Sequence, residues 1–404
     1  MNAIGTGGSS APQPLTLDFT SVAPDSGGVG VVAKGVAAGL ASVDVQFRCV
    51  VNSSNYDKWL VSLPELTTLF EPVEVRLNAS SSWQQALRKI LPRGGLLTQS
   101  AVSWARSIRA NSTRTALGEG VVWHPFHRVP VAGNSSVVTV HDLRVFEPEL
   151  ASPMDQKIIE RNVHEAGAVV CSWAHPYLSL IERFPAAREK TFLVPLPVLN
   201  PGPWQTHTRP PHKARLLLPG FVTPHKNHEV VVRALAKMPE AQVVFTGSED
   251  GSYGNWLREL AASLGVAERI EWLGFVDEAR LEAEYERADM LVMPTRWEAA
   301  SGPVFEAIIR GLPFVASRID PIVSQLSILG LKAETFAWDD PNELCAAVSR
   351  TLSRYDNAVS DLEPLSRELR ARDWAQVAGE YNRVFEWVNG TGEKPLDLMR
   401  GEII

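Results

Sequence analysis

The chain has 404 residues, of which 45% are apolar and 21% charged, and its formal net charge is −7. This length exceeds what one ordinary hydrophobic core organises, so we expect two domains. The acidic balance argues against a nucleic-acid partner, and the lack of any run of about 18 apolar residues argues against a membrane-spanning helix. The cysteines Cys49, Cys171 and Cys345 are too far apart to suggest a metal site or a disulfide framework, which fits a reducing cytoplasm.

The first half of the chain begins with a tail and then alternates strands with helices. Residues 1–12 are rich in Gly, Ser and Ala and lack the basic start and apolar stretch of a signal peptide, so we expect a disordered tail. The pattern predicts a strand at 15–20, a glycine-rich loop at 26–30 and a helix at 31–40. Further strands are predicted at 121–124, 136–141, 168–172 and 192–195.

The second half repeats this alternation after a proline-rich linker. Prolines cluster in 197–203 and at 210–211, so the domain boundary is placed near residue 200. Strands are predicted at 214–218, 242–246, 269–273, 290–293 and 313–316, with helices between them that include 227–237 and 278–287. We expect helices in 362–388 and a loosely ordered end at 389–404. The alternation predicts the α/β class, with parallel sheets covered by helices on both faces.

Two glutamates eight positions apart are the most informative local feature. Glu298 follows a predicted strand, and Glu306 lies in a helix predicted to begin at Pro303, with Gly302 as its cap. In an open α/β sheet, ligands bind at this carboxyl edge of the strands. A helix N-terminus favours an anionic group. Two acceptor-only side chains beside an anion site suit a polyhydroxylated ligand that carries a phosphate, such as a nucleotide sugar.

The spacing and its flanks carry a family resemblance. The residues Gly-Pro-Val-Phe-Glu-Ala around Glu306 are followed by Gly-Leu-Pro-Phe-Val-Ala-Ser. Together with Glu298 they resemble the E-x7-E motif of the retaining glycosyltransferases of family 4, the group 1 type, which includes bacterial mannosyl- and N-acetylglucosaminyltransferases. The resemblance implies that Glu306 accepts the ribose hydroxyls of a donor nucleotide and that Glu298 accepts hydroxyls of its sugar.

The same resemblance implies the architecture. It predicts the GT-B fold, in which two Rossmann-like, doubly wound parallel-sheet domains face a central cleft. Residues 13–200 would form the N-terminal acceptor-binding domain and 201–365 the C-terminal nucleotide-sugar-binding domain. Residues 366–392 would be helices that cross back to the first domain. The start of the helix after Glu298, with Gly302, Pro303 and Val304, would belong to the donor site.

A lysine lies at another predicted strand-to-helix turn. Lys226 follows the strand 214–218, where its ammonium can meet a diphosphate. A fixed cation there stabilises the negative charge that builds on a leaving diphosphate. The segment resembles the family's phosphate-binding loop, which often carries an arginine five residues before the lysine, but this chain has Phe221 there. Either His225 or His228 supplies the missing cation, or Lys226 and the helix terminus act alone.

Candidate site residues also lie in the first half. Gly28 and Gly30 suit close backbone approach to a ligand, and the family's similar loop meets the diphosphate and the acceptor; a plain tight turn is the alternative. His141 ends a predicted strand and resembles the family's histidine that contacts the donor sugar, although a core or capping histidine would fit as well. His124 and His127 also end a strand and are candidates for an acceptor pocket.

Two loops of the second half are candidates for the nucleotide base. They are 247–250, which begins with Gly247, and 273–277, which contains Phe275. Both follow predicted strands, and the family holds the base by such loops, often through backbone groups.

A basic block stands out in this acidic chain. Residues 88–114 carry six basic side chains and no acidic one, with tryptophans interleaved. These are Arg88, Lys89, Arg93, Arg106, Arg109 and Arg114, with Trp83 and Trp104. The block could rest on an anionic membrane and receive a lipid-linked acceptor, or it could be an ordinary solvated helical face.

The function implied by the resemblance is metal-independent, retaining transfer of a hexose, mannose-like or N-acetylglucosamine-like. The donor would be a nucleoside diphosphate sugar, and the acceptor a hydroxyl of a glycan, a glycolipid or a small molecule. We expect no cofactor, no nucleic-acid partner and a cytoplasmic location, with peripheral contact at the inner face of the membrane. Two alternatives stay open, a sugar-nucleotide epimerase on the same fold and a catalytically silent binding subunit.

Overall fold

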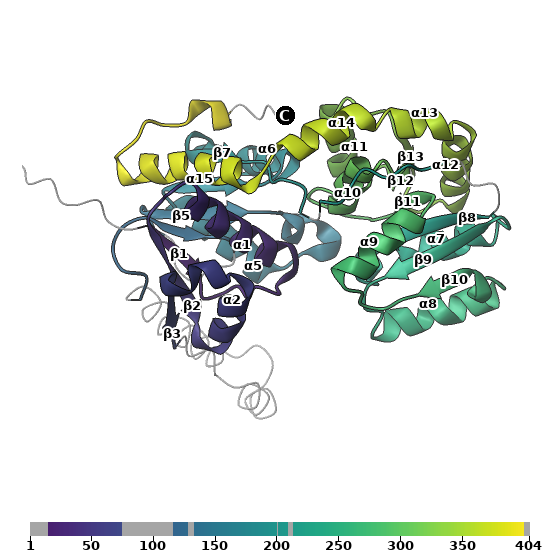
Figure 1. Cartoon of the computed structure of the whole chain (residues 1–404), viewed down its shortest axis with the longest axis horizontal. Coiled ribbons are helices and arrows are strands. Elements are labelled where there is room, and N and C mark those ends of the chain that lie inside the picture. Colours follow the sequence, from purple (N-terminus) through teal and green to yellow (C-terminus); the bar gives the residue numbers. More distant parts are fainter. Residues whose placement is uncertain (1–14, 75–115, 128–132, 200, 209–212, 400–404) are drawn as a thin grey trace, which may run out of the picture. The chain divides into compact units, whose positions relative to one another are not determined.

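The computed structural model describes residues 15–74, 116–127, 133–199, 201–208 and 213–399. The chain forms two compact units (Figure 1). The first comprises the described residues up to Pro195 together with those from Trp374 onward, and the second comprises Leu196–Asp373. The expected division into an acceptor-binding and a donor-binding domain stays a prediction.

The first unit contains a seven-stranded sheet in which all neighbouring strands are parallel. The strand order is β3-β2-β1-β4-β5-β6-β7. This order reverses between β1 and β4, which makes that position the topological switch point of a doubly wound sheet. The strands are β1 (Leu15–Phe19), β2 (Phe47–Asn52), β3 (Phe70–Val73), β4 (Val122–His124), β5 (Ser136–Val140), β6 (Ala168–Cys171) and β7 (Thr191–Leu193).

Strands β2 and β3 are missing from the predicted elements because charged residues interrupt their apolar pattern. Arg48 and Glu71 stand in these strands, and their side chains form an ion pair with 2.5 Å between Nη1 and Oε2. Pro72 also stands in β3. It is tolerated because β3 is the edge strand, where a missing backbone donor leaves no ladder bond unmade.

Among the described residues, the helices of the first unit are α1 (Gly27–Ser42), α2 (Tyr56–Ser62), α5 (Pro153–Glu165), α6 (Ala174–Arg183) and α15 (Trp374–Asn389). Because α1 begins at Gly27, the glycine-rich run is the first turn of a helix, and the predicted loop at 26–30 is wrong. Gly28 and Gly30 therefore have helical backbones. A Cβ at Gly30 would lie 2.6 Å from the carbonyl oxygen of Pro24, so a glycine is needed for packing against the preceding turn.

Helix α15 packs on α1 through two further glycines. A Cβ on Gly35 would lie 2.2 Å from a ring carbon of Trp374, and a Cβ on Gly39 would lie 2.2 Å from the Trp374 carbonyl oxygen. These glycines let the two helix backbones approach closely, so the small residues of α1 explain why α15 belongs to the first unit.

The end of the chain is better ordered than the sequence indicated. A short 3₁₀-helix, η8 (Leu396–Met399), follows α15. The Tyr177 hydroxyl donates to the carbonyl oxygen of Met399, and the Lys394 ammonium lies 2.8 Å from a carboxylate oxygen of Glu189. The expected loose order is therefore wrong as far as Met399.

A buried, hydrogen-bonded pair of an aspartate and a histidine joins the two strands at the switch point of the first sheet. Asp18 of β1 and His124 of β4 are 2% and 1% exposed, and Oδ2 of Asp18 lies 2.8 Å from Nδ1 of His124. The Thr20 hydroxyl donates to Oδ1 of Asp18 at 2.6 Å, and Nε2 of His124 lies 3.3 Å from Oγ of Ser136. His124 is thus enclosed within the unit, so the expectation that it lines an acceptor pocket is wrong.

The second unit contains a six-stranded parallel sheet in the order β10-β9-β8-β11-β12-β13. Its strands are β8 (Ala214–Pro219), β9 (Ala241–Thr246), β10 (Ile270–Trp272), β11 (Met290–Met293), β12 (Phe314–Ser317) and β13 (Glu334–Phe336). The order repeats that of the first sheet, with its switch point between β8 and β11. The predicted class, two doubly wound α/β domains with parallel sheets, is confirmed.

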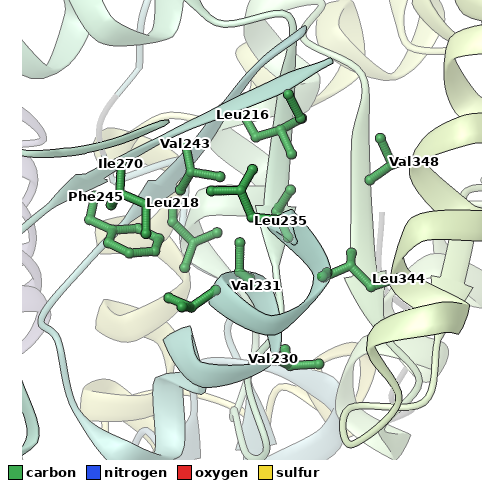
Figure 2. Packing of buried hydrophobic residues seen from close by; sticks show 14 of the residues in the cluster. Leu216, Leu218, Val230, Val231, Leu235, Val243, Phe245, Ile270, Leu344 and Val348 are labelled. Atoms are coloured by element: carbon green, nitrogen blue, oxygen red, sulfur yellow. The ribbon is translucent and has the colours of Figure 1, made fainter. Parts of the chain in front are cut away.

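The helices of the second unit cover both faces of this sheet. They are α7 (His228–Leu235), α8 (Ser252–Ser263), α9 (Glu278–Arg287), α10 (Gly302–Arg310), α11 (Asp320–Ile328), α12 (Pro341–Ser353), α13 (Tyr355–Ser360) and α14 (Glu363–Ala371). Leu216 and Leu218 of β8 pack with Val231 of α7 on one face (Figure 2), while Leu217 joins the core on the other face. Successive strand residues point to opposite faces, which is why residues 216–218 in the middle of β8 are continuously apolar.

His228, the first residue of α7, is a buried polar residue at the edge of this core. It is 1% exposed, and its ring meets that of Phe245 edge-on with centroids 4.8 Å apart. Among the described residues neither ring nitrogen has a hydrogen-bond partner. Burial, and then the charges of Lys226 and His225, lower the pKa of His228 to about 3. His228 is therefore neutral at physiological pH.

Replacing Asp18 by Asn tests the buried pair. Burial alone would raise the Asp18 pKa, but the hydrogen bond and charge of His124, with the hydrogen bonds of Thr20, outweigh it and hold that pKa below its ordinary value. As pH falls, the Asp18 carboxylate is therefore protonated in the unfolded chain at a higher pH than in the folded protein. The pair's stabilisation is full above the unfolded pKa, about 3.9, and is lost as pH falls through the folded pKa.

Asp18→Asn should lower the free energy of unfolding at pH 7 by about 1.5–3 kcal/mol, measured by urea denaturation. The difference from wild type should shrink below pH ~4. Asp25→Asn, which removes an exposed pair with Lys58, is the control and should change little. A difference that does not depend on pH would contradict the assignment of charge to Asp18.

His228→Leu should weaken the dependence of the free energy of unfolding on pH in weak acid. The folded pKa of about 3 lies below the unfolded value of about 6.5, so the wild type loses stability as pH falls between them, by about 1.4 kcal/mol per unit. The leucine variant should lack this loss and be at least as stable at pH 7, because two unpaired buried nitrogens are removed. His164→Leu, which changes an exposed histidine, is the control. If the free energy of unfolding depends on pH with the same slope in the wild type and in both variants, the prediction is refuted.

Candidate active site

Two loops meet at the switch point of the second sheet, and each carries a predicted site residue. Lys226 lies in η6 (Pro224–Lys226), the 3₁₀ turn that follows β8, and Glu298 follows β11. The Lys226 ammonium donates to Oε1 of Glu298, and the two side chains are only 22% and 14% exposed. Two residues 72 positions apart in sequence are thus in direct contact. They stand where ligands bind in doubly wound sheets.

Asn227 fixes the turn that carries Lys226. It has φ +59°, in the left-handed region that asparagine tolerates better than most residues, and it is 1% exposed. Its amide nitrogen donates to the carbonyl oxygens of Pro294 (2.9 Å) and Trp338 (2.6 Å), and its amide oxygen accepts from Arg296 (3.2 Å). The turn after β8 is therefore fastened to the segment that follows β11.

Arg296 is a cation near this turn that the sequence analysis missed. Its backbone N–H donates to the His225 carbonyl oxygen at 2.8 Å, and its guanidinium lies 3.5 Å from Oε2 of Glu229 and 5.0 Å from the centre of the Trp338 ring. The signal available in the sequence was its position two residues before Glu298. The buried, neutral His228 is not the cation that replaces the family's arginine.

Glu306 lies in α10, whose start differs by one residue from the prediction. The cap is Ser301, whose hydroxyl accepts from the backbone N–H of Val304 at 3.4 Å. Gly302 and Pro303 are therefore the first and second helical residues, not the cap and the first. The physical reason is that serine can bond a free N–H of the first turn whereas glycine cannot. The helix ends at Arg310, and its C-cap Gly311 has φ +73°.

The carboxylate of Glu306 accepts a hydrogen bond from a residue of the same unit. Its Oε2 accepts from the hydroxyl of Tyr285 at 2.8 Å. Tyr285 belongs to α9 and is fully buried. No sequence pattern indicates this contact, because a tyrosine in an amphipathic helix is expected simply to pack in the core.

The two loops predicted to hold the base contact each other, and the loop after β9 also contacts the loop that carries Lys226. Gly247, after β9, has φ +123°, and its N–H donates to the Gly274 carbonyl oxygen at 2.6 Å. A Cβ on Gly247 would lie 2.3 Å from the carbonyl oxygen of Gly220, so only glycine fits. Phe275 is 79% exposed and Phe221 is 59% exposed. Two unshielded aromatic rings thus stand on the loops after β10 and β8.

His141 lies in the first unit, directly after β5. Its Nε2 lies 2.9 Å from the Pro125 carbonyl oxygen and its Nδ1 lies 2.8 Å from Oγ of Ser172. A carbonyl only accepts, so Nε2 carries the proton and Nδ1 accepts from the serine. Burial lowers the pKa of His141, against the opposing effects of the Pro125 carbonyl and Asp142, which fits this neutral form. His141 therefore presents a neutral ring.

The basic block at 88–114 lies outside the described residues. Within the described ranges, no helix combines the length and the apolar character that crossing a membrane requires.

Part of the chain matches a known family model. Residues 205–358, most of the second unit, match the model described as glycosyl transferases group 1. Among curated proteins, D-inositol 3-phosphate glycosyltransferase 2 of Catenulispora acidiphila is 31% identical over 193 residues, which are 44% of this chain and 45% of that protein. The chain thus spans less than half the length of this relative.

Solved structures match over nearly the whole chain. Sucrose-phosphate synthase from Thermosynechococcus elongatus gives a TM-score of 0.69 at 16% identity, covering 94% of this chain and 100% of that one. HepE from Anabaena, in complex with UDP-glucose, gives 0.65 at 13% identity, covering 93% and 99%. Identities this low show the fold alone, which is GT-B. Residues 205–358 are the part of this chain that is similar to the group 1 glycosyl transferases.

Proposed function

We propose that the chain is a retaining glycosyltransferase that moves a hexose from a nucleoside diphosphate sugar to an acceptor hydroxyl. The observation that carries the proposal is the contact between Lys226 and Glu298 at the switch point of the second sheet. A cation for a diphosphate and a carboxylate for sugar hydroxyls stand side by side there. The family match over the same residues supports this reading.

In this proposal the second unit binds the donor. Lys226 neutralises the diphosphate, Glu306 accepts the ribose hydroxyls, and Glu298 accepts hydroxyls of the sugar. Each carboxylate is an acceptor-only group and so suits a hydroxyl donor. The positive end of the α10 helix dipole favours the diphosphate, and the exposed ring of Phe275 offers a face on which a base can stack.

The reaction is a substitution on one face of the sugar. The bond from sugar C1 to the diphosphate oxygen breaks while a bond forms from C1 to the acceptor oxygen on the same face. The acceptor proton passes to the leaving diphosphate, so the atoms and charges balance. Lys226 stabilises the charge that builds on the diphosphate. That no metal takes part stays a prediction.

The donor and acceptor are proposed only as chemical classes. The structure of HepE is described as holding UDP-glucose, and the relative from Catenulispora is named for an inositol phosphate acceptor. UDP-glucose, UDP-N-acetylglucosamine and GDP-mannose are therefore the first donors to screen, by thermal shift and by slow donor hydrolysis. Binding without any hydrolysis or transfer would favour the silent binding subunit, and isomerisation of the donor without an acceptor would favour the epimerase.

Lys226→Ala should lower kcat by roughly two to three orders of magnitude, because a charge-stabilising donor is lost mainly in the transition state. Lys226→Arg should restore little activity, because a planar guanidinium does not reproduce the geometry of an ammonium. Steady-state transfer from the donor found in the screen measures both. Lys237→Ala, in which an exposed lysine of the same unit is removed, is the control. Wild-type turnover in Lys226→Ala would exclude Lys226 from the mechanism.

Glu298→Gln should change the affinity for the free nucleoside diphosphate and the affinity for the nucleotide sugar in opposite directions. In the ligand-free protein Glu298 occupies the Lys226 ammonium, so a diphosphate must compete with it. The variant should bind the free nucleoside diphosphate more tightly and the nucleotide sugar less tightly, and we expect the ratio of the two affinities to change by about tenfold, or ~1.4 kcal/mol. Calorimetry measures both affinities.

The control for Glu298 is Glu334→Gln, since Glu334 is paired with Arg350 at 2.7 Å in the same unit. That change should alter neither affinity. If Glu298→Gln weakens the free diphosphate, the carboxylate holds Lys226 in place for its ligand and does not compete for it.

A further inference from the structure

A buried tyrosine lies behind Glu306. Tyr285 is 0% exposed, and its hydroxyl donates to Oε2 of Glu306 at 2.8 Å. The phenol has one proton, and this proton is given to the carboxylate. Burial, and then the charge of Glu306, raise the pKa of Tyr285 well above its ordinary value. The hydroxyl therefore remains a donor at every physiological pH, and one carboxylate oxygen of Glu306 has a fixed partner.

An arginine braces this tyrosine. Arg310 is 0% exposed, and its guanidinium carbon lies 4.5 Å from the centre of the Tyr285 ring. A cation over a ring is attracted to its face, and its field strengthens donation by the phenol hydroxyl. Nη1 of Arg310 also donates to the backbone carbonyl oxygen of Glu306 at 3.1 Å. Arg310 thus fixes both the ring that holds the carboxylate and the backbone that carries it.

The buried charge of Arg310 is compensated from the other side. Its Nε donates to Oε2 of Glu282 at 2.9 Å, and Oε1 of Glu282 accepts from the Gln205 side chain at 2.8 Å. Arg310 is buried while the Glu282 side chain is 31% exposed, and a pair that removes a charge from water contributes little to stability compared with apolar packing. These connected polar groups end at the Glu306 carboxylate. Orienting that carboxylate explains their presence better than a gain in stability does.

We propose that Tyr285, braced by Arg310, is a positioning residue that orients the Glu306 carboxylate toward the ribose hydroxyls of the donor. This rests on the proposed function, which assigns Glu306 to the ribose. A carboxylate that accepts hydroxyls needs a defined rotamer, and Tyr285 selects it before the ligand arrives. Tyr285 itself touches no reacting atom in this proposal.

The test compares ligands that differ only at the ribose. Wild type and Tyr285→Phe are titrated by calorimetry with UDP and GDP, with their 2′-deoxy forms, and with inorganic pyrophosphate. The variant keeps the ring under Arg310 and loses only the hydroxyl. It should bind the nucleoside diphosphate about tenfold more weakly, and the preference for the 2′-hydroxyl form should fall toward unity. Pyrophosphate, which has no ribose, should bind both proteins equally.

Catalysis supplies a second readout. With the donor from the screen, Tyr285→Phe should raise KM and leave kcat nearly unchanged, because a ribose contact is made equally in the ground and transition states. Tyr355→Phe is the matched control, since it deletes another buried tyrosine hydroxyl of this unit, one that donates to the Asp289 carbonyl oxygen at 2.7 Å. It should change stability but not nucleotide binding. Glu306→Ala should abolish the ribose preference.

The outcomes separate this inference from the proposed function. A wild-type ribose preference that persists in Tyr285→Phe would overturn the positioning role and leave the proposed function standing. Equal loss of pyrophosphate binding in the variant would show general damage to the site and would also overturn it. A wild type that binds neither nucleotide, or that ignores the 2′-hydroxyl, would contradict the assignment of Glu306 and this inference with it.

Discussion

The attachment of the turn after β8 to the end of β11 is the constraint on which the candidate site depends. Asn227 makes it, since its left-handed backbone ends the turn and its amide bonds the Pro294 and Trp338 carbonyl oxygens. Because Lys226 and Glu298 stand on the two joined segments, their opposite charges are held in contact without a ligand. The switch point thereby carries both a cation and a carboxylate, which is what a charged, hydroxyl-rich ligand requires.

Buried polar groups recur in both units. In the first, Asp18 and His124 pair across the two central strands; in the second, Arg310 lies between Tyr285 and Glu282. Burying such groups is unfavourable unless each finds partners of good geometry. Their satisfied hydrogen bonds fix directions that apolar packing leaves free. The second group transmits that fixed direction to Glu306, whereas the first joins strands of the sheet.

Much of the fold was predictable because it is local. Runs such as 168–171 and 290–293 are continuously apolar and β-rich, as strands buried on both faces must be. Strand β3 was missed because an edge strand accepts charge and proline, which hides its pattern, and β2 was missed because Arg48 interrupts its apolar run. The glycine run before residue 31 was misread because glycine serves both loops and close helix packing, and only the neighbouring Pro24 carbonyl distinguishes them.

The sequence by itself determined most of the alternation of elements, the presence of a helix after Glu298, and the placement of Lys226 and Glu298 after strands and of Glu306 in that helix. Those features arise from interactions between near neighbours in the chain, and periodicity and capping report them directly. Only the tertiary structure decided that Lys226 meets Glu298, that Tyr285 lies behind Glu306, and that His228 is buried and neutral. These contacts join residues far apart in sequence, and strand order and helix packing bring them together. A local sequence pattern does not predict these contacts, because any apolar face can pack against several others.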